Sequence, residues 1–320
     1  MNLQGEHRRA RASRLVRIVT ALAVTVGGAG CGIGSKQQEA DRIHASRQKV
    51  AEASPATGTL TFELEVDQGN VSGLEDDERA QLASVLGGGG GTPSIAAAVA
   101  LDGGARRART SLAAPEGAVE RTSVFDDNDI YVRRQNARAT ERRTWAKLDL
   151  DRVVENERPL ALREMTVSGV LDAAASTINP VFLVELVEGA LAGSVERVGT
   201  ETVAEVATTR YDANISFDKA MTELGFDDEE RAVRLRLFQL LGATKDVVPA
   251  RIWIDADGRL RRFRIELEQR ITRQRANTLV ATVDLTAFAS DATVDLPAPD
   301  GIVSYERFGR LVRAALPAEA

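Results

Sequence analysis

Hydrophobic and polar positions alternate along most of the chain after residue 56, which predicts a protein built mainly from β-strands. Within residues 59–67, Leu60, Phe62, Leu64 and Val66 fall on one face and threonine or glutamate on the other, as in a half-buried strand. Similar short runs follow at residues 94–101, 105–112, 119–125, 130–133, 144–150, 194–198, 201–206, 208–217, 250–255, 260–269 and 278–288. Hairpin-length turns separate most of them, so we expect antiparallel neighbours; parallel crossovers need longer connections.

A helical period replaces the alternation in four segments. Residues 32–56 place Ile43 and Val50 on one helical face, and residues 227–241 open with four acidic residues, which suit a helix N-terminus. Residues 168–189 are apolar over most of their circumference and are divided by Asn179-Pro180, so they must be buried or face something apolar. Residues 305–315 predict a last helix, after Pro297 and Pro299 end the sheet. The fold class that fits is α+β, one large antiparallel sheet with helices on one face.

The N-terminus has the pattern of an export signal. Five arginines precede the apolar run 18–26, which is shorter than the roughly 20 residues that span a bilayer. Cys31, directly after Ala29-Gly30, resembles the lipidated cysteine of a bacterial lipobox, although Gly28 stands where that motif usually has an aliphatic residue. Two or more acyl chains on Cys31 would anchor the protein stably. The alternative is a secreted protein with an incidental thiol.

Composition narrows the function classes. The chain has one cysteine and two histidines, both histidines within its first 44 residues, which argues against internal disulfides, a zinc site or a histidine-dependent catalytic triad in the rest of the chain. Removing residues 1–30 takes away five arginines and one glutamate, so the net charge moves from −6 to −10. That charge disfavours nucleic acid and offers no overall attraction to anionic lipid. Membrane attachment would have to come from the acyl chains.

Other candidate sites have simpler interpretations. The acidic turn at Asp126, Asp127 and Asp129 lacks the following glutamate of a calcium loop, and the glycine run 87–91 lacks the lysine and serine or threonine of a phosphate-binding loop. We expect a solvated turn and a flexible insertion, Asp255 to Gly258 as a hairpin turn, and His44 as an exposed tether residue. No metal, no cofactor and no enzymatic activity are expected. The many arginines of the strands either face solvent or, at a cavity mouth, contact lipid phosphates.

Three sequence segments resemble the LolA-like and mycobacterial LprG/LppX-type lipoproteins. They are Trp145-Ala146-Lys147-Leu148, the stretch from Gly199 to Tyr211, and the stretch from Val248 through Asp255 to Arg262. The resemblance covers roughly residues 38 to 300. It implies a sheet curved into a half-barrel, helices packed on its concave face, and a cavity between the layers that takes the acyl chains of lipids or lipoproteins. The glycine insertion and the extension after Pro299 depart from the family.

We therefore expect residues 1–30 to be a lipoprotein signal peptide, 31–56 a lipidated tether and short helix, 57–300 the lipid-binding domain and 301–320 a C-terminal extension with a helix. The expected function is that of a monomeric lipoprotein on the outer face of the bacterial cytoplasmic membrane, anchored through Cys31, which binds or carries an apolar ligand. The alternative is a closed-core envelope lipoprotein that acts through protein contacts. The candidate interior residues, which would line the cavity, are Leu64, Val66, Val170, Leu171, Ile178, Phe182, Leu186, Val187, Trp253, Ile254, Ile265 and Leu267.

Overall fold

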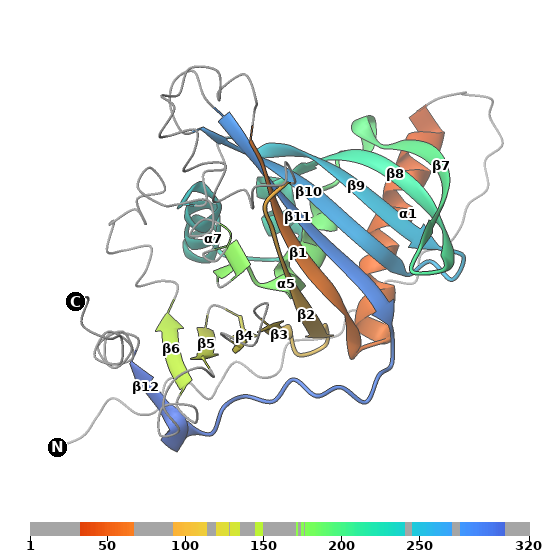
Figure 1. The fold of residues 1–320 in the computed structure, drawn as a ribbon. Coiled ribbons are helices and arrows are strands. Elements are labelled where there is room, and N and C mark those ends of the chain that lie inside the picture. The colour runs from red at the N-terminus through yellow and green to blue at the C-terminus, as the bar shows by residue number, and fades with distance from the viewer. Residues whose placement is uncertain are drawn as a thin grey trace.

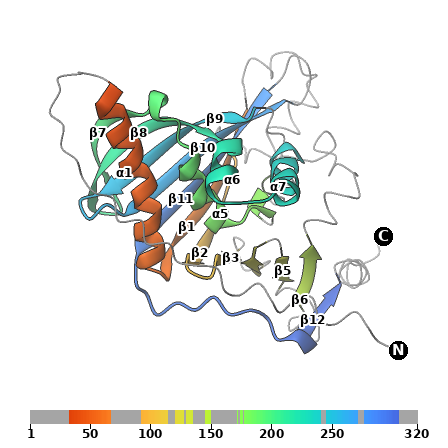
Figure 2. The same ribbon diagram turned by 180° about the vertical axis from the view of Figure 1, so that it is seen from behind.

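The computed structural model describes residues 33–66, 92–113, 120–127, 129–134, 145–149, 171, 174–175, 177–240, 245–270 and 276–304. Twelve strands within these ranges form one open, curved sheet, and the helices lie on its concave side (Figures 1 and 2). The expected α+β class, with a mostly antiparallel sheet, is confirmed. The C-terminal helix expected at residues 305–315 and the glycine run 87–91 lie outside the described residues.

Strand β1 (Ala56–Val66) lies in the middle of the sheet and pairs with a strand on each side. One flank is a meander of β2 (Ser94–Asp102), β3 (Arg107–Ala113), β4 (Glu120–Asp126), β5 (Asp129–Arg134) and β6 (Trp145–Asp149). The other flank runs outward through β11 (Ala276–Ala287), β10 (Leu260–Arg270), β9 (Val247–Asp255), β8 (Val206–Ser216) and β7 (Glu196–Val203). β1 therefore joins two antiparallel halves that are distant in sequence.

Side-chain caps mark the starts of α5 and α7. Asn179 accepts a hydrogen bond from the backbone nitrogen of Val181 at the start of α5 (Pro180–Glu185), which continues into the 3-10 turn η3 (Leu186–Gly189). Asp227 and Glu230 form reciprocal hydrogen bonds at the start of α7 (Asp228–Leu240). The remaining helical elements are α1 (Ile33–Glu52), η4 (Ala192–Ser194), α6 (Phe217–Glu223) and η5 (Pro299–Gly301).

Two sequence predictions on this flank were wrong. Residues 194–198 and 201–206 are not two strands, because β7 runs through Gly199 with an irregular register and turns at Ala204 and Glu205. Both turn residues have positive φ, 48° and 66°, a conformation that glycine, asparagine and aspartate signal and these residues do not. The sequence also missed α6, because its first residue, Phe217, continues the alternation of β8 and only Ser216, its N-cap, marks the change.

The sheet does not end at the prolines. After Pro297 and Pro299 the chain adds β12 (Ile302–Ser304), which pairs in parallel with β6 at the sheet edge (Figure 1). Proline removes one backbone donor but leaves the residues after it free to pair. Residues 33–52 and 302–304, which lie on either side of the expected 57–300 domain, thus both join the same fold.

Side-chain alternation divides the sheet into an apolar concave face and a charged convex face. Concave residues of β1, β2, β8, β9, β10 and β11 form one buried cluster with residues of α1, α5, η3, α6 and α7. On the convex face, arginines pair with carboxylates of other strands, as Arg262 of β10 does with Asp284 of the adjacent β11 and Arg264 of β10 does with Glu65 of β1, beyond β11. Within the described residues, no helix combines the length and apolar character needed to cross a membrane.

Candidate functional site

Most of the candidate interior residues come together between the helices and the sheet. Nine of them belong to the same buried cluster, and they are Leu64, Leu171, Ile178, Phe182, Leu186, Val187, Ile254, Ile265 and Leu267. They come from β1, β9 and β10 on one side and from α5, η3 and the segment before α5 on the other. The side chains of Val66 and Val170 lie outside the described residues, as does Cys31.

Trp253 does not join this group. It neighbours Ile254 in β9, and consecutive strand residues point to opposite faces, so the two cannot both line one interior. Trp253 lies on the convex face, where its indole nitrogen donates a hydrogen bond to Glu201 at 2.7 Å and Arg262 lies over its ring. The hydrogen bond to the indole is the main factor that lowers the pKa of Glu201.

The interior is closed around several of the candidate residues. Ile178, Leu186, Val187, Ile265 and Leu267 each expose 0% of their surface. A side chain that lines a void of water size keeps some accessible surface, so atoms of neighbouring residues enclose these side chains on every side. An acyl chain would reach them only if the helices moved away from the sheet.

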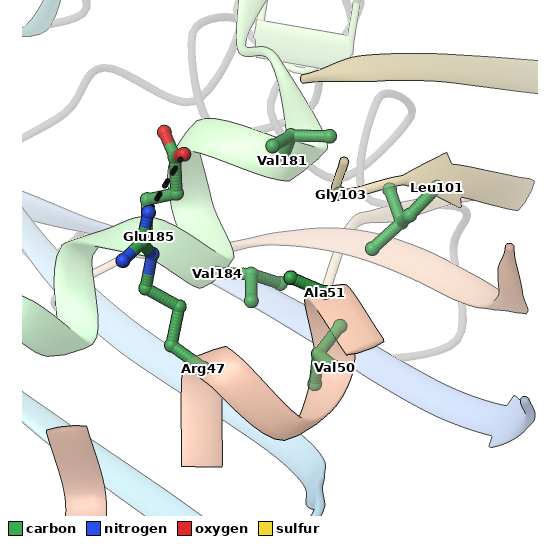
Figure 3. A pocket seen from close by; sticks show the side chains of 8 residues that line it. All are labelled: Arg47, Val50, Ala51, Leu101, Gly103, Val181, Val184 and Glu185. Carbon is green, nitrogen blue, oxygen red and sulfur yellow. Dashed lines mark ion pairs between the residues drawn. The ribbon is translucent and has the colours of Figure 1, made fainter. Parts of the chain in front are cut away.

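A pocket opens beside this interior, where α1, β2 and α5 meet (Figure 3). Its cavity volume is about 20 Å³, enough for roughly one water molecule, and its apolar walls are Val50, Ala51, Leu101, Val181 and Val184. Four of these walls, all but Ala51, belong to the buried cluster. Gly103, Arg47 and Glu185 complete the lining. The pocket thus faces solvent, and its inner wall is part of the core.

One buried carboxylate holds the polar end of the pocket. The side chain of Glu185 is 5% exposed and accepts a hydrogen bond from Arg106 at 2.8 Å. Its other oxygen lies 3.6 Å from Arg47 (Figure 3). Arg47 also contacts Glu188 at 3.2 Å. A buried carboxylate needs such partners, since an uncompensated charge in the interior is strongly destabilising. The ion pairs fasten α5 and η3 to α1 and to the turn between β2 and β3.

His44 belongs to this network and is not the exposed tether residue that the sequence suggested. Its Nδ1 lies 2.8 Å from Glu188 of η3, because α1 packs its inner face on the core through Ala40, Ile43 and Val50. Burial acts to raise the pKa of Glu188, but the hydrogen bond with His44 and the charge of Arg47 outweigh it and lower the pKa below its ordinary value.

The acidic turn that resembles a calcium loop is occupied by basic side chains. Asp126 pairs with Arg107, Asp127 with Arg234, and Asp129 with Lys147. Throughout the described part of the chain, no three His, Cys, Asp or Glu side chains are arranged to hold a metal ion.

Sequence reasoning missed the polar residues of this site. Glu185 interrupts the apolar run from Val181 to Val187, and a lone acidic residue in such a run was the available signal. Nothing in the sequence links Glu185 to Arg47 or Arg106, because the pairs join residues 138 and 79 positions apart. Only the packing of α1 and α5 against the sheet brings them together.

No family model matches the chain, and no curated protein is similar to it in sequence at a significant level. Among solved structures, the Mycobacterium tuberculosis lipoprotein LppX shares 15% identity with a TM-score of 0.39, covering 81% of this chain and 99% of LppX. LprF from Mycobacterium bovis shares 14% with a TM-score of 0.36, covering 82% and 98%. A putative outer membrane lipoprotein-sorting protein domain from Vibrio parahaemolyticus shares 9% with a TM-score of 0.27, covering 87% and 96%. These identities and TM-scores are too low to show what this chain binds. The similar structures are of the same LolA-like and LppX-type lipoproteins that the sequence segments resemble.

Proposed function

We propose that this chain is an exported, non-enzymatic lipoprotein that binds an acyl chain between its sheet and its helices. The observation that carries the proposal is the pocket between α1, β2 and α5, whose apolar walls continue into the buried cluster. An acyl chain that enters there replaces water on apolar surface, which contributes about 25 cal/mol per Å². The acyl chain moves from the pocket into the interior as α5 and η3 move away from the concave face.

A ligand titration tests this entrance. Ala51 faces the pocket from α1, so Ala51→Phe would fill it and weaken binding of a fluorescent fatty-acid analogue at least tenfold, about 1.4 kcal/mol. Ala45→Phe is the matched control, because residue 45 lies on the same helix and is exposed. Native mass spectrometry of the gently purified protein should show a co-purified lipid. Equal binding by both variants and the wild type would place the ligand elsewhere.

The alternative function is that of a closed-core envelope protein that acts through protein contacts. The complete burial of Ile178, Leu186 and Ile265 favours it, because these side chains are already enclosed. A wild-type protein that carries no lipid after purification and takes up no acyl probe would establish this alternative over the first.

Membrane attachment through Cys31 belongs to the same proposal. Cys31→Ser removes the thiol that would carry the acyl chain, so the protein should move from the membrane fraction to the soluble fraction. Ser35→Ala, close by in α1, is the control. Membrane retention of the Cys31→Ser variant, measured by fractionation and immunoblot, would refute the anchor on the outer face of the cytoplasmic membrane.

A further inference from the structure

Two arginines share one phenylalanine ring next to the candidate site. The guanidinium carbon of Arg234, from α7, lies 4.2 Å from the ring centre of Phe226, and that of Arg106, from the turn between β2 and β3, lies 4.7 Å from the same centre. Arg234 also lies 4.9 Å from the ring of Phe182 in α5. We call these four residues the arginine–phenylalanine cluster.

The positive charge of Arg234 is only partly compensated. Its side chain is 5% exposed, and its ion-pair partner in the described part of the chain is Asp127, which is 53% exposed. The Nε atom of Arg234 is buried and has no hydrogen-bond partner among the described residues. Burial is the main factor that lowers the pKa of Arg234, and the nearby charge of Arg106 adds to it. A carboxylate in contact with water therefore balances a guanidinium that is mostly out of water.

The positive charge of Arg106 is compensated more fully than that of Arg234, but by a carboxylate that Arg106 shares with another arginine. Its carboxylate, Glu185, also contacts Arg47. Arginine presents several N–H donors in a plane, which suits the two oxygens of a carboxylate or phosphate. A second anion beside Arg106 and Arg234 would take the position of Asp127, whose side chain is 53% exposed, and would bring a further acceptor toward the buried Nε of Arg234.

The cluster is linked to the pocket through Glu185 and to the candidate interior residues through Phe182. Glu185 lines the pocket and holds Arg106, while Phe182 belongs both to the cluster and to the candidate interior residues. Figure 2 shows α5, α6 and α7 gathered on the same side of the sheet. An acyl chain in contact with Phe182 would therefore run close to Arg234.

We propose that Arg106 and Arg234 bind the anionic group, a carboxylate or a phosphate, of an amphiphile whose acyl chain occupies the interior. This inference rests on the proposed function and adds the chemical class of the ligand. The cation–π contacts with Phe226 hold both guanidinium groups in place when Asp127 leaves.

The test compares ligands that share a 16-carbon chain and differ only in the headgroup. The purified protein, stripped of lipid, is titrated with hexadecanoate, hexadecyl phosphate and hexadecanol against a neutral fluorescent acyl probe. The wild type should bind both anionic ligands about tenfold more tightly than the alcohol, as one charge-assisted hydrogen bond would give. In both Arg106→Gln and Arg234→Gln, the ratio of the affinity for the anionic ligands to the affinity for hexadecanol should fall to about one.

Two further variants keep the test decisive if Arg234→Gln folds poorly. Asp127→Asn, in an exposed turn, removes the competing carboxylate and should tighten binding of hexadecanoate but not of hexadecanol. Arg259→Gln is the matched control, because Arg259 lies over a different ring, Phe288, at 5.5 Å. Its headgroup preference should equal that of the wild type.

The possible results distinguish a failure of the headgroup site from a failure of the proposed acyl-chain binding. Equal affinity of the wild type for the alcohol and both anionic ligands would overturn the headgroup site and leave acyl-chain binding intact. No binding of any 16-carbon ligand would overturn the proposed function itself. A further outcome is that inorganic phosphate binds as tightly as hexadecyl phosphate and loses this binding in Arg234→Gln. That result would show a site for free anions and overturn the inference that the ligand is an amphiphile.

Discussion

At the scale of single residues, buried charges are held by partners that the sequence places far away or just across a turn. Asp255 ends β9 with its side chain 3% exposed, accepts hydrogen bonds from the backbone nitrogens of Asp257 and Arg259, and pairs with Arg261 at 2.7 Å. The expected hairpin turn at this place is confirmed, with Gly258 at a φ of 79°. One carboxylate thus both shapes the turn and neutralises an arginine beneath it.

Asp255→Asn should therefore destabilise the protein by about 3 kcal/mol, because it leaves Arg261 buried without its counter-charge. Asp257→Asn should change the free energy of unfolding by no more than about 0.5 kcal/mol, because the side chain of Asp257, in the same turn, is 66% exposed. Urea unfolding followed by circular dichroism measures both. Similar losses for the two variants would mean that the pair with Arg261 contributes little.

Glu188 gives the protein a predictable response to acid. Its pKa is lowered in the folded state, so the folded form releases the proton more readily than the unfolded chain does. The stabilisation is complete above about pH 5 and disappears as the pH falls through the lowered pKa. The free energy of unfolding of the wild type should exceed that of Glu188→Gln at pH 7, and the two should converge near pH 3.

Glu196→Gln, on the exposed edge strand β7, is the control for that comparison. The free energy of unfolding of Glu196→Gln should differ little from that of the wild type at both pH values, since the side chain of residue 196 lies in solvent. If the difference in free energy of unfolding between the wild type and Glu188→Gln stays constant from pH 7 to pH 3, the ion pairs with His44 and Arg47 are not the source of that difference.

At the scale of the elements, the central strand depends on one close backbone approach. β1 meets β11 with a register irregularity between Thr57 and Gly58. A methyl group on Gly58 would lie 1.7 Å from the backbone carbonyl oxygen of Asp284, a distance that no contact tolerates. The absence of a side chain at this position therefore lets the two halves of the sheet join closely.

Gly58→Ala should destabilise the protein by about 2 kcal/mol or more, because the backbone of β11 must shift to accommodate the new methyl group. Gly199→Ala is the matched control on edge strand β7, where the added methyl group would meet nothing within 4 Å. Thermal unfolding of the two variants measures the difference. Equal melting temperatures would show that β11 adjusts freely.

At the scale of the whole molecule, one sheet and one buried cluster extend through both halves of the fold. β1 pairs with both flanking meanders, and residues from β2 to β5 and from β8 to β11 share the cluster with the helices. The two tryptophans report on the two halves, Trp145 in β6 and Trp253 in β9. We expect the halves to unfold together.

Trp145→Phe and Trp253→Phe each leave a single tryptophan as reporter. In each variant, the urea transition followed by tryptophan fluorescence should coincide with the transition followed by far-ultraviolet circular dichroism. The shared core is the reason, because one half cannot lose its packing without exposing the other. Separate midpoints in either variant would show that the halves unfold independently.

The strands and helices could be predicted largely from local pattern. Alternation located β1 to β6 and β9 to β11, and Asn179-Pro180 and the acidic run at 227–230 located helix starts, since these signals lie within a few neighbouring residues. The turn at Ala204 and Glu205, the helix α6 and the strand β12 were not predicted. Their conformations are imposed by packing or by a distant strand, and the local residues carry little trace of them.

The sequence by itself determined the class of the fold and the apolar character of the candidate interior, because both follow from short-range periodicity. It did not determine the site. The pocket walls come from three separate elements, Glu185 meets Arg47 and Arg106 across long stretches of chain, and Arg234 reaches Asp127 and Phe182 only when α7 lies beside α5 and the turn between β4 and β5. Such contacts depend on which faces meet in three dimensions, and the tertiary structure alone decides that.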